Sequence, residues 1–337
     1  MALADTDGST NTEVRGDGAE KIRRQLRRWF RTHGRDLPWR QTTDPYAILV
    51  SEFMLQQTTV AAVVPYFKRW MATFPNVAAL AAAEESQVLS HWQGLGYYSR
   101  ARNLHRAARK VMGDHGGQVP HDRIGLRSLP GVGDYTAGAV MAFAYDAAVP
   151  VIDANIARVL ARLEDWKHPI DDPRGSEFLQ AAAERLLPAR GGRRHTSAVM
   201  ELGALVCVAK TPRCGQCPVR ANCRAGEPAR LPIKRPRRAV EEVQDQRAFV
   251  WAQGKIWLEC SSGPRWRGLW MLPVAENPRR AAVYEEIYPI TRFRVALKVV
   301  REGKLGRELT GFPPGECPAM PSPHRRAVAA LTGKRHS

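Results

Sequence analysis

Hydrophobic positions recur at helical spacing over the first two thirds of the chain. The first strong pattern starts at Glu20, and its apolar positions are Ile22, Leu26, Trp29 and Phe30. From there to about residue 225 the sequence is rich in Ala, Leu and Val, with Gly and Pro as punctuation and no alternation of period two. Residues 1–19 are polar and lack any period, which predicts a disordered tail. The pattern thus predicts an all-α domain over residues 20–225.

A basic segment that contains several prolines follows the helical region. Residues 224–238 hold six basic residues, one acidic residue and three prolines. Because proline removes a helical hydrogen bond and clashes with the preceding turn, this segment cannot sustain a helix. We therefore predict a basic linker over residues 226–245.

Short β-prone runs replace the helical pattern beyond the linker. They lie at residues 248–252, 255–260 and 293–300. Gln253 and Gly254 separate the first two runs, and a two-residue connection that contains Gly favours a β-hairpin. The sequence predicts a small α+β domain over residues 246–325, followed by a short basic tail over residues 326–337.

The charge of the chain indicates a polyanionic partner. Among 337 residues, Lys and Arg total 51 against 33 Asp and Glu, which gives a net charge of +18. Such a balance favours association with nucleic acid and is unusual for a neutral metabolic enzyme. The uncharged apolar stretch at residues 135–145 is too short to span a membrane, and the N-terminal residues lack the pattern of a secretory signal. We therefore expect a cytoplasmic protein associated with the nucleoid.

Four of the six cysteines lie close together in the sequence. Cys207, Cys214, Cys217 and Cys223 form the pattern C-x6-C-x2-C-x5-C. Four such thiolates can hold a tetrahedral zinc ion or an iron-sulfur cluster, whereas disulfides would be reduced in the cytoplasm. Only Cys214 and Cys217 have the short spacing typical of structural zinc, so the residues alone leave both metals open. The loop also carries cations that suit a phosphate backbone, namely Lys210, Arg213, Arg220 and Arg224.

A glycine-containing turn, LPGVG at residues 129–133, separates two predicted helices at residues 122–128 and 135–145. Gly131 and Gly133 allow a sharp turn and a close approach to a ligand, and the next helix start presents free N–H groups. Such a turn can bind a phosphate without recognising sequence. Taken alone, it is also compatible with an ordinary helix-helix turn.

The order of these motifs resembles that of a known family. LPGVG is followed by YTAGAV, VIDANIARVLARL and ELGALVC, and then by the remaining three cysteines, as in the helix-hairpin-helix DNA glycosylases that carry a 4Fe-4S cluster. LPWR at residues 37–40, DPYAILVSEFMLQQT at 44–58 and GLGYYSRARNL at 94–104 are similar to the adenine DNA glycosylases of the MutY type. The resemblance covers about residues 20–225. It implies an all-α helix-hairpin-helix domain with a 4Fe-4S cluster on the four cysteines, and removal of adenine mispaired with 8-oxoguanine.

The resemblance also implies two catalytic carboxylates. Cleavage of the bond between adenine and deoxyribose needs a proton for the departing base and a counter-charge for the sugar cation. Glu52 corresponds to the general acid, and its apolar neighbours would keep it protonated. Asp153 corresponds to the carboxylate that stabilises or attacks the sugar cation, with Asn155 beside it to orient a water or the carboxylate. The purely structural alternatives are a solvated glutamate on a helix face for Glu52 and an N-cap role for Asp153.

A tyrosine replaces the amine of the related lyases. Tyr135 stands where glycosylase/lyases carry a nucleophilic lysine, so no Schiff base and no strand cleavage are expected. Thymine-mismatch glycosylases of the same superfamily can also carry Tyr at this position. The residue therefore distinguishes mechanism better than substrate.

Further positions match the family's contacts with DNA and with the extruded base. The DNA-contacting positions that wedge into the duplex or contact the opposing base are Gln56, Gln57, Thr58, Leu95 and Tyr97. Trp39 and Arg40 match the adenine pocket. Ala154 replaces a more usual glycine. Ser197 stands where Glu or Gln would face the adenine amino group, so this position does not by itself indicate selectivity for adenine.

The predicted α+β domain resembles the MutT-like (Nudix-like) domain that follows the cluster in this family. The resemblance rests on PRWRGLWMLP at residues 264–273. The sequence of the predicted domain, residues 246–325, lacks the R-E-x-x-E-E metal box, so we expect no pyrophosphatase activity. Ile290, Thr291 and Arg292 align with the Phe-Ser-His that reads 8-oxoguanine, and the aromatic contact is lost.

We therefore expect a monofunctional DNA N-glycosylase, a hydrolase without lyase activity, that acts on adenine opposite 8-oxoguanine or guanine. Its partner would be double-stranded DNA containing a mispair. A monomer is expected, because an asymmetric mispair does not demand two-fold symmetry. The alternatives are a thymine-mismatch glycosylase, a non-catalytic iron-sulfur protein that binds DNA, and a zinc-stapled DNA-binding module.

Overall fold

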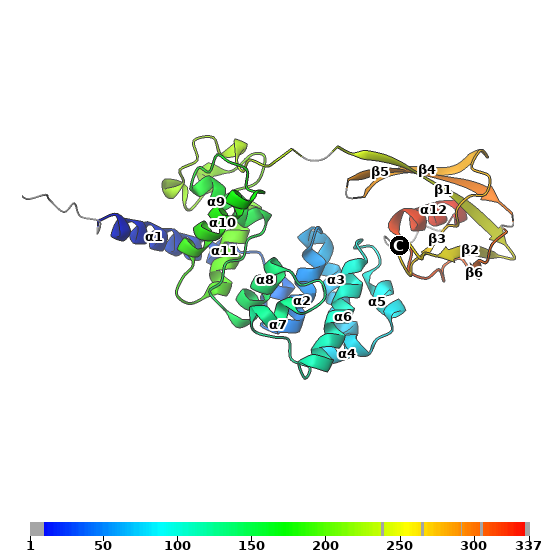
Figure 1. Cartoon of the computed structure of the whole chain (residues 1–337), viewed down its shortest axis with the longest axis horizontal. Coiled ribbons are helices and arrows are strands. Elements are labelled where there is room, and N and C mark those ends of the chain that lie inside the picture. Colours follow the sequence, from blue (N-terminus) through cyan, green and yellow to red (C-terminus); the bar gives the residue numbers. More distant parts are fainter. Residues whose placement is uncertain (1–9, 237–238, 264–265, 291, 304–305, 334–337) are drawn as a thin grey trace, which may run out of the picture. The chain divides into compact units, whose positions relative to one another are not determined.

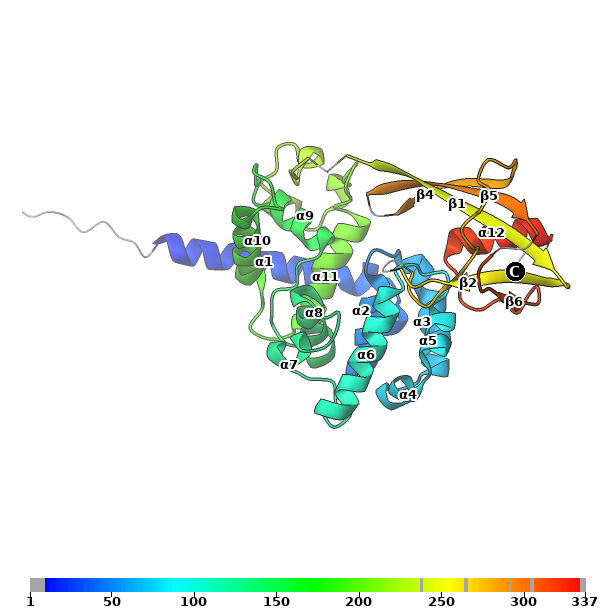
Figure 2. The same ribbon diagram turned by 45° about the vertical axis from the view of Figure 1, so that its right-hand side comes forward.

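The computed structural model describes residues 10–236, 239–263, 266–290, 292–303 and 306–333 (Figures 1 and 2). The chain divides into two compact units. The first unit comprises Met1–Ala78 and Ala107–Pro236, and the second comprises Ala79–Arg106 and Arg237–Ser337. The two units are described separately below.

The regular secondary structure in the described part of the first unit is helical. Its helices are α1 (Thr10–His33), α2 (Pro45–Leu55), α3 (Val60–Thr73), α7 (Arg123–Arg127), α8 (Asp134–Tyr145), α9 (Ala154–Leu163), α10 (Pro173–Leu186) and α11 (Gly192–Leu205), with 3-10 turns η1 (Pro38–Arg40), η2 (Cys214–Gln216), η3 (Arg220–Asn222) and η4 (Pro228–Arg230). Two helices, α4 (Val77–Ala82) and α6 (Ser99–Asp114), run from one unit into the other. The predicted all-α architecture of this region is confirmed.

One core joins α1, α9, α10 and α11. Its buried side chains include Leu26 of α1, Leu160 of α9 and Leu202 of α11. Both views show α9, α10 and α11 grouped around the C-terminal half of α1, whose N-terminal half projects beyond them (Figures 1 and 2). This packing holds α9 and α11, which carry part of the candidate site.

Helix α2 is buried on nearly all sides. Asp44 caps its N-terminus by accepting hydrogen bonds from the backbone N–H groups of Tyr46 and Ala47, and Pro45 occupies the first helical position. Every residue from Tyr46 to Met54 is buried, because α2 packs against both α3 and α8. A polar side chain on α2 is therefore held in an apolar environment.

Helix α1 begins earlier than its sequence pattern indicates. It starts at Thr10, whereas we predicted a disordered tail over residues 1–19; residues 1–9 lie outside the described part. Once the segment that begins at Glu20 forms a helix, each residue added before it gains a backbone hydrogen bond without the cost of nucleation. The extension therefore does not need the apolar periodicity on which the prediction relied.

The second unit holds a mixed sheet and several helices. Its strands are β1 (Glu241–Ala252), β2 (Lys255–Cys260), β3 (Trp270–Met271), β4 (Ala282–Ile290), β5 (Phe293–Glu302) and β6 (Thr310–Phe312), and its helices include α5 (Glu85–Trp92) and α12 (Ser322–Thr332). The strand order is β3-β2-β1-β5-β4, with β6 paired to β2. β1 and β5 are parallel and the other pairs are antiparallel. The predicted α+β character of this region is confirmed.

The predicted hairpin forms between β1 and β2. Gln253 and Gly254 both have positive φ angles, 54° and 70°, as a type I′ turn requires. The first strand is longer than predicted, because β1 begins at Glu241, inside the predicted linker of residues 226–245. Its polar first half pairs with β5 from Glu241 opposite Phe293 onward, so ladder hydrogen bonds replace the missing apolar signal.

The C-terminal segment is a helix over much of the range where a basic tail was predicted, residues 326–337. α12 continues to Thr332, and residues 334–337 lie outside the described part. Ala327 and Val328 are buried against the sheet core with Leu297 and Val299. α12 lies against the sheet in both views (Figures 1 and 2). The helix is also held by buried His324, whose Nδ1 accepts a hydrogen bond from the backbone N–H of Leu272 at 3.2 Å.

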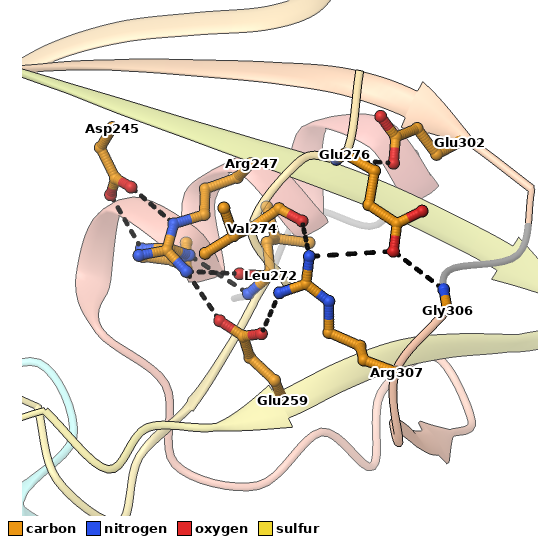
Figure 3. A network of polar contacts seen from close by, with 10 residues as sticks. Asp245, Arg247, Glu259, Leu272, Val274, Glu276, Glu302, Gly306 and Arg307 are labelled. Atoms are coloured by element: carbon orange, nitrogen blue, oxygen red, sulfur yellow. Dashed lines mark hydrogen bonds and ion pairs between the residues drawn. The ribbon is translucent and has the colours of Figure 1, made fainter. Parts of the chain in front are cut away.

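A network of ion pairs lies within the second unit (Figure 3). Arg247 on β1 donates hydrogen bonds to Asp245, to Glu259 at 2.9 Å and to the carbonyl oxygen of Leu272 at 3.1 Å. The other carboxylate oxygen of Glu259 accepts from Arg307 at 3.4 Å. Glu259 thus holds two arginines from different parts of the chain.

We expect Glu259→Gln to loosen the sheet by roughly 2–3 kcal/mol, because the amide replaces one carboxylate that serves two guanidinium groups. Hydrogen exchange of the β1 and β2 amides measures this loss locally. The matched control is Glu308→Gln, since Glu308 is exposed and has no ion pair with the described residues. Equal protection in the two variants would contradict a stabilising role for Glu259.

Candidate active site

A cavity of about 1000 Å³ lies in the first unit. α2, α8, α9, α11 and η1 all contribute to its wall. The predicted site residues that line it are Trp39, Arg40, Glu52, Gln56, Gln57, Thr58, Tyr135, Asp153 and Asn155. The fold therefore brings together positions that are more than a hundred residues apart in the chain.

Glu52 lies on buried helix α2, and only 4% of its surface is exposed. Its Oε2 atom has no hydrogen-bond partner among the described residues. Burial raises the pKa of Glu52 to about 7; a hydrogen bond with Tyr135 opposes this shift, and the negative charge of Asp153 adds to it. Glu52 is thus buried rather than a solvated glutamate, and it can hold a proton near neutral pH.

Asp153 is the N-cap of α9 and also faces the cavity. Its Oδ1 accepts a hydrogen bond from the backbone N–H of Ile156 at 2.7 Å, and its Oδ2 accepts one from Nδ2 of Asn155 at 2.9 Å. Burial raises the pKa of Asp153, while these hydrogen bonds and the charge of Arg158 oppose the rise. The N-cap interpretation is confirmed, and it is compatible with a functional carboxylate.

Tyr135 completes the group around the two acids. Burial and the negative charges of Glu52 and Asp153 raise the pKa of its phenol well above the usual range. The hydroxyl therefore stays protonated and can donate a hydrogen bond to a carboxylate.

Arg158 connects the site to the cysteine loop. Its guanidinium donates to Oδ1 of Asn155 at 2.8 Å and to the carbonyl oxygens of Cys207 and Gly203, both at 2.7 Å. Gly203 permits this approach, since a Cβ there would lie only 2.7 Å from Cβ of Asn155. Hydrogen bonds through Arg158 therefore link the backbone of the cysteine loop to the amide of Asn155, which contacts Asp153.

The structure reveals a charged group in the cavity wall that the motifs did not identify. Glu201 on α11 is fully buried and accepts three hydrogen bonds from Arg35, from its backbone N and its side chain, all at 2.8 Å, and one from Arg40 at 2.9 Å. Burial tends to raise the pKa of Glu201, but these hydrogen bonds outweigh it and hold the pKa at about 2. A glutamate four residues after the pocket position Ser197, within the quoted ELGALVC, was the available signal.

Trp39 and Ser197, which the family resemblance assigns to the adenine pocket, both line the cavity. Trp39 is 9% exposed and packs edge-on against Phe67, with 5.5 Å between the ring centroids. Ser197 is 6% exposed and lines the same cavity as Met200 and Ala204 of α11. The small serine leaves this part of the wall without the longer polar side chain that the family resemblance would place there.

The glycine turn lies at the surface between α7 and α8. Gly131 has a φ of 80°, a value that favours glycine. Gly133 is the N-cap of α8 without a capping side chain, and a Cβ there would meet nothing within 4 Å. No capping side chain therefore occupies the N-terminus of α8, and the phosphate contact expected there stays a prediction.

The other predicted DNA contacts are distributed over both units. Gln57 lines the cavity with a left-handed φ of 57°. In the second unit Leu95 is buried, whereas Tyr97 is 42% exposed with a φ of 47°. Arg100 supports their loop by donating to the carbonyl oxygens of Leu95 and Gly96 at 3.1 and 3.2 Å.

The turn between β4 and β5 differs from a lesion-binding loop with free donors. Thr291 lies outside the described residues. Arg292 forms an ion pair with Glu241 at 3.2 Å, and Ile290 packs against the sheet core. The donor that Arg292 was predicted to offer is therefore engaged within the unit.

The four cysteines gather in one loop beside the α9–α11 core. Cys207, Cys217 and Cys223 pack against that core. Burial raises the pKa of the Cys217 thiol to about 11, and the charges of the other three cysteines add to the shift, so the four sulfurs are neighbours. In the described part of the chain, no group of three or more His, Cys, Asp or Glu side chains is arranged to hold a single metal ion.

Arg162 on α9 holds the backbone of the cysteine loop through hydrogen bonds. It is 1% exposed and donates to the carbonyl oxygens of Cys207, Val208, Ala209 and Leu231 at 2.8–3.1 Å. It also donates to Sγ of Cys207 at 3.3 Å. One buried guanidinium therefore satisfies carbonyl groups that would otherwise lose their hydrogen bonds to water.

We expect Arg162→Lys to destabilise the cysteine loop by roughly 3 kcal/mol, because an ammonium cannot reproduce the planar fork of donors. Hydrogen exchange of residues 206–225 and the metal content of the purified protein measure the effect. The control is Arg224→Lys, an exposed loop arginine paired with Glu164. Unchanged exchange and metal content in Arg162→Lys would contradict the assignment.

The described residues contain no helix that is long and apolar enough to cross a membrane. This finding agrees with the short apolar stretches in the sequence.

Comparison with known proteins defines the class first. Residues 50–185 match the model of the HhH-GPD superfamily base excision DNA repair proteins. The fold is also that of a thermostable thymine-DNA glycosylase, with a TM-score of 0.57 and 29% identity over 62% of this chain and 96% of the other. Endonuclease III in a complex with DNA shares the fold, with a TM-score of 0.54, 23% identity and coverage of 63% and 97%.

Curated relatives narrow the class. The chain is 43% identical to the adenine DNA glycosylase of Mycolicibacterium smegmatis over 218 residues, which cover 64% of this chain and 73% of the relative. It is 44% identical to the adenine DNA glycosylase of Rattus norvegicus over 214 residues, or 60% of this chain and 41% of the relative. It therefore belongs to the HhH-GPD superfamily and, within it, to the family of the adenine DNA glycosylases. The chain spans about two fifths of the length of the rat and human relatives that it matches.

Proposed function

We propose that the chain is a monofunctional DNA glycosylase that hydrolyses the N-glycosidic bond of adenine mispaired with 8-oxoguanine or guanine. The observation that carries the proposal is the pair of buried acids in one cavity, Glu52 with a pKa of about 7 and Asp153 beside it. The names of the curated relatives and the family membership support the same reaction.

The two acids take different roles. The protonated carboxyl of Glu52 donates its proton to the imidazole-ring nitrogen of the base that points away from the sugar, which makes adenine a better leaving group. Asp153 acts as the carboxylate, since its two hydrogen bonds and Arg158 favour its charged form, and it stabilises the positive charge that develops on the sugar. Tyr135 offers no amine, so water completes the hydrolysis and the strand stays intact.

The DNA must present its base outside the helix, which costs a few kcal/mol. We propose that the open amides after Gly131 and Gly133 bind a phosphate, while Gln56, Gln57 and Thr58 at the cavity edge contact the duplex. Leu95 and Tyr97 serve as the wedge and stacking face, since Tyr97 is exposed on a loop held by Arg100. A single copy of the chain is sufficient for such an asymmetric partner.

We propose that Cys207, Cys214, Cys217 and Cys223 hold a 4Fe-4S cluster. The donor set fits, because four neighbouring thiols lie against an apolar core and Arg162 contributes a positive charge. When bound, the cluster supplies a four-point cross-link of the loop. Iron content and a brown colour distinguish it from zinc.

For the second unit, we propose a MutT-like domain that assists recognition of the opposing base. The sequence GLW followed by Pro273, together with a mixed sheet that packs against α12, supports this assignment. Because Arg292 is paired with Glu241, we expect the preference for 8-oxoguanine over guanine to depend little on this turn.

The test is single-turnover base release from three duplexes, with adenine opposite 8-oxoguanine, adenine opposite guanine, and thymine opposite guanine. Alkali then breaks the abasic strand, and reactions without alkali measure lyase activity. Release of adenine only after alkali supports the proposal. Release of thymine with adenine untouched would favour the thymine-mismatch alternative. We include this duplex because the fold matches that of a thymine-DNA glycosylase and because Ser197 is small.

A further inference from the structure

A stripe of exposed cations runs along α1, away from the residues of the cavity wall. It consists of Lys21, Arg24, Arg28 and Arg31, all exposed and without a hydrogen bond or ion pair to the side chains that the structure describes, which in α1 begin at Gly18. Their spacing of three, four and three residues places them within about 80° of one another around the helix and over about 15 Å of its length. The apolar residues that pack into the core, such as Leu26 and Trp29, lie on the opposite side.

The stripe cations form no ion pair with the side chains that the structure describes. Arg23 and Arg27, on the adjacent side, form ion pairs with Glu20 at 2.7 and 3.2 Å, and of the stripe cations Arg24 adds only its charge to the environment of Glu20. Like charges three or four residues apart repel and destabilise a helix.

The stripe leads into a basic groove. A hollow of about 480 Å³ is lined by Arg28, Arg31 and His33 of α1 and by Pro218 of the cysteine loop. Just beyond α1, Arg35 lines the large cavity with the two acids. The cationic surface therefore begins close in sequence to the catalytic cavity and extends along α1 away from it.

The chemistry of the stripe favours a phosphate backbone over a protein partner. None of the large exposed hydrophobic residues in the described part of the chain lies on α1, whereas a protein interface needs an apolar centre. A row of unpaired cations over about 15 Å matches the rise of about four base pairs of duplex. Phosphate contacts of this kind give affinity without recognising sequence.

We propose that Lys21, Arg24, Arg28 and Arg31 form a second DNA-binding surface, which engages the phosphates of duplex outside the mispair. The proposal rests on the proposed function only in taking DNA as the partner. It adds a surface that retains the protein on undamaged duplex, and this surface takes no part in base release.

The test compares the full chain with the variant in which all four cations are changed to Gln, Lys21→Gln, Arg24→Gln, Arg28→Gln and Arg31→Gln. Gln is a good helix former, so α1 is preserved. Affinity for an undamaged duplex is measured from 50 to 200 mM salt. We expect the slope of log affinity against log salt to become shallower by about 3–4, since each phosphate contact contributes about 0.9. Between 50 and 200 mM salt, the stripe variant should therefore lose about a hundredfold less affinity than the wild type loses.

The matched control removes four other exposed cations that also lack ion pairs with the described residues: Arg174, Arg190, Lys255 and Arg279, each changed to Gln. Because they are scattered, their loss should change the slope by less than about one phosphate contact. A double variant, Arg24→Gln with Arg28→Gln, should show about half the effect and covers the case in which the quadruple variant does not fold. Equal slopes for the stripe and control variants would overturn the proposal.

Two further measurements separate the possible outcomes. Single-turnover base release at saturating protein should be unchanged in the stripe variant. If the wild-type chain released no base, the proposed activity would fail, while the salt slopes would still decide the role of the stripe. Polyglutamate is titrated in parallel, and tighter binding to it than to duplex, lost in the stripe variant, would assign an acidic protein partner and overturn the DNA-binding surface.

Discussion

Glu52→Gln is expected to lower single-turnover base release by roughly 10²–10⁴-fold while DNA binding survives. The amide keeps the shape of the side chain but has no acidic proton to give to the departing base. Because Glu52 is 4% exposed in a preformed cavity, the substitution leaves the duplex contacts of the protein in place. Quenched single-turnover assays and filter binding on the same duplex separate the two effects. Glu177→Gln, at an exposed position, is the control and should behave as wild type.

The pH dependence has a definite sign. The pKa of Glu52 is raised from 4.5 to about 7, so the protonated, active form is lost as the pH rises through 7 and the rate should fall tenfold per unit above it. The same shift lowers stability, since the native state disfavours the charged form. The free energy of unfolding of the wild type should decrease by roughly 3 kcal/mol from pH 4.5 to pH 7 relative to Glu52→Gln, and the difference should stay constant above that.

Two results would contradict this role. Full activity in Glu52→Gln would exclude Glu52 as the proton donor. A difference in stability between the two proteins that did not change between pH 4.5 and 7 would show that the carboxyl of Glu52 titrates as it does in water.

Features that depend on one local motif were easier to predict from the sequence than the ends of helices and strands. Gln253 and Gly254 alone indicate the hairpin, because a type I′ turn needs two positive φ angles over two residues. The start of β1 at Glu241 depends instead on β5, some fifty residues later in the chain, which supplies the hydrogen bonds for a polar segment. The end of α12 likewise depends on the packing of Ala327 and Val328 against the sheet, which the sequence alone does not show.

In the candidate site, too, the motif residues could be predicted from the sequence and the partners that are distant in the chain could not. Glu52 and Asp153 belong to motifs with a recognisable order, and the structure places both at one cavity. Glu201 lies within a quoted motif, yet the sequence alone does not show that it pairs with Arg35 and Arg40, more than 160 residues earlier. A buried charge of this kind is defined by its partners, and those partners are known only after folding.

Glu201→Gln is expected to produce the largest loss of stability, about 3–5 kcal/mol. The carboxylate is fully buried and accepts four hydrogen bonds from Arg35 and Arg40, which hold its pKa at about 2. An amide accepts on one side only and turns an N–H₂ group toward a guanidinium. Two cations at the cavity wall are then left without their counter-charge, so Arg40 and the neighbouring Trp39 should lose their fixed positions.

Glu164→Gln is the matched control for this substitution. Glu164 also lies between two arginines, Arg185 at 3.3 Å and Arg224 at 2.7 Å, but its side chain is 30% exposed. Water can replace the lost partner there, so the expected cost is below about 1 kcal/mol. Hydrogen exchange of the α1 and α11 amides reports the local free energy of opening for both variants.

The pH window distinguishes the charge of Glu201 from its packing. Because the pKa of Glu201 is lowered, the stability that it contributes is fully present above about pH 4.5 and is lost as the pH falls toward 2. The difference between the wild type and Glu201→Gln should therefore stay constant from pH 5 to 8 and shrink only in acid. If Glu201→Gln cost no more than Glu164→Gln throughout that range, Glu201 would not be the charge that holds the arginines of the cavity wall.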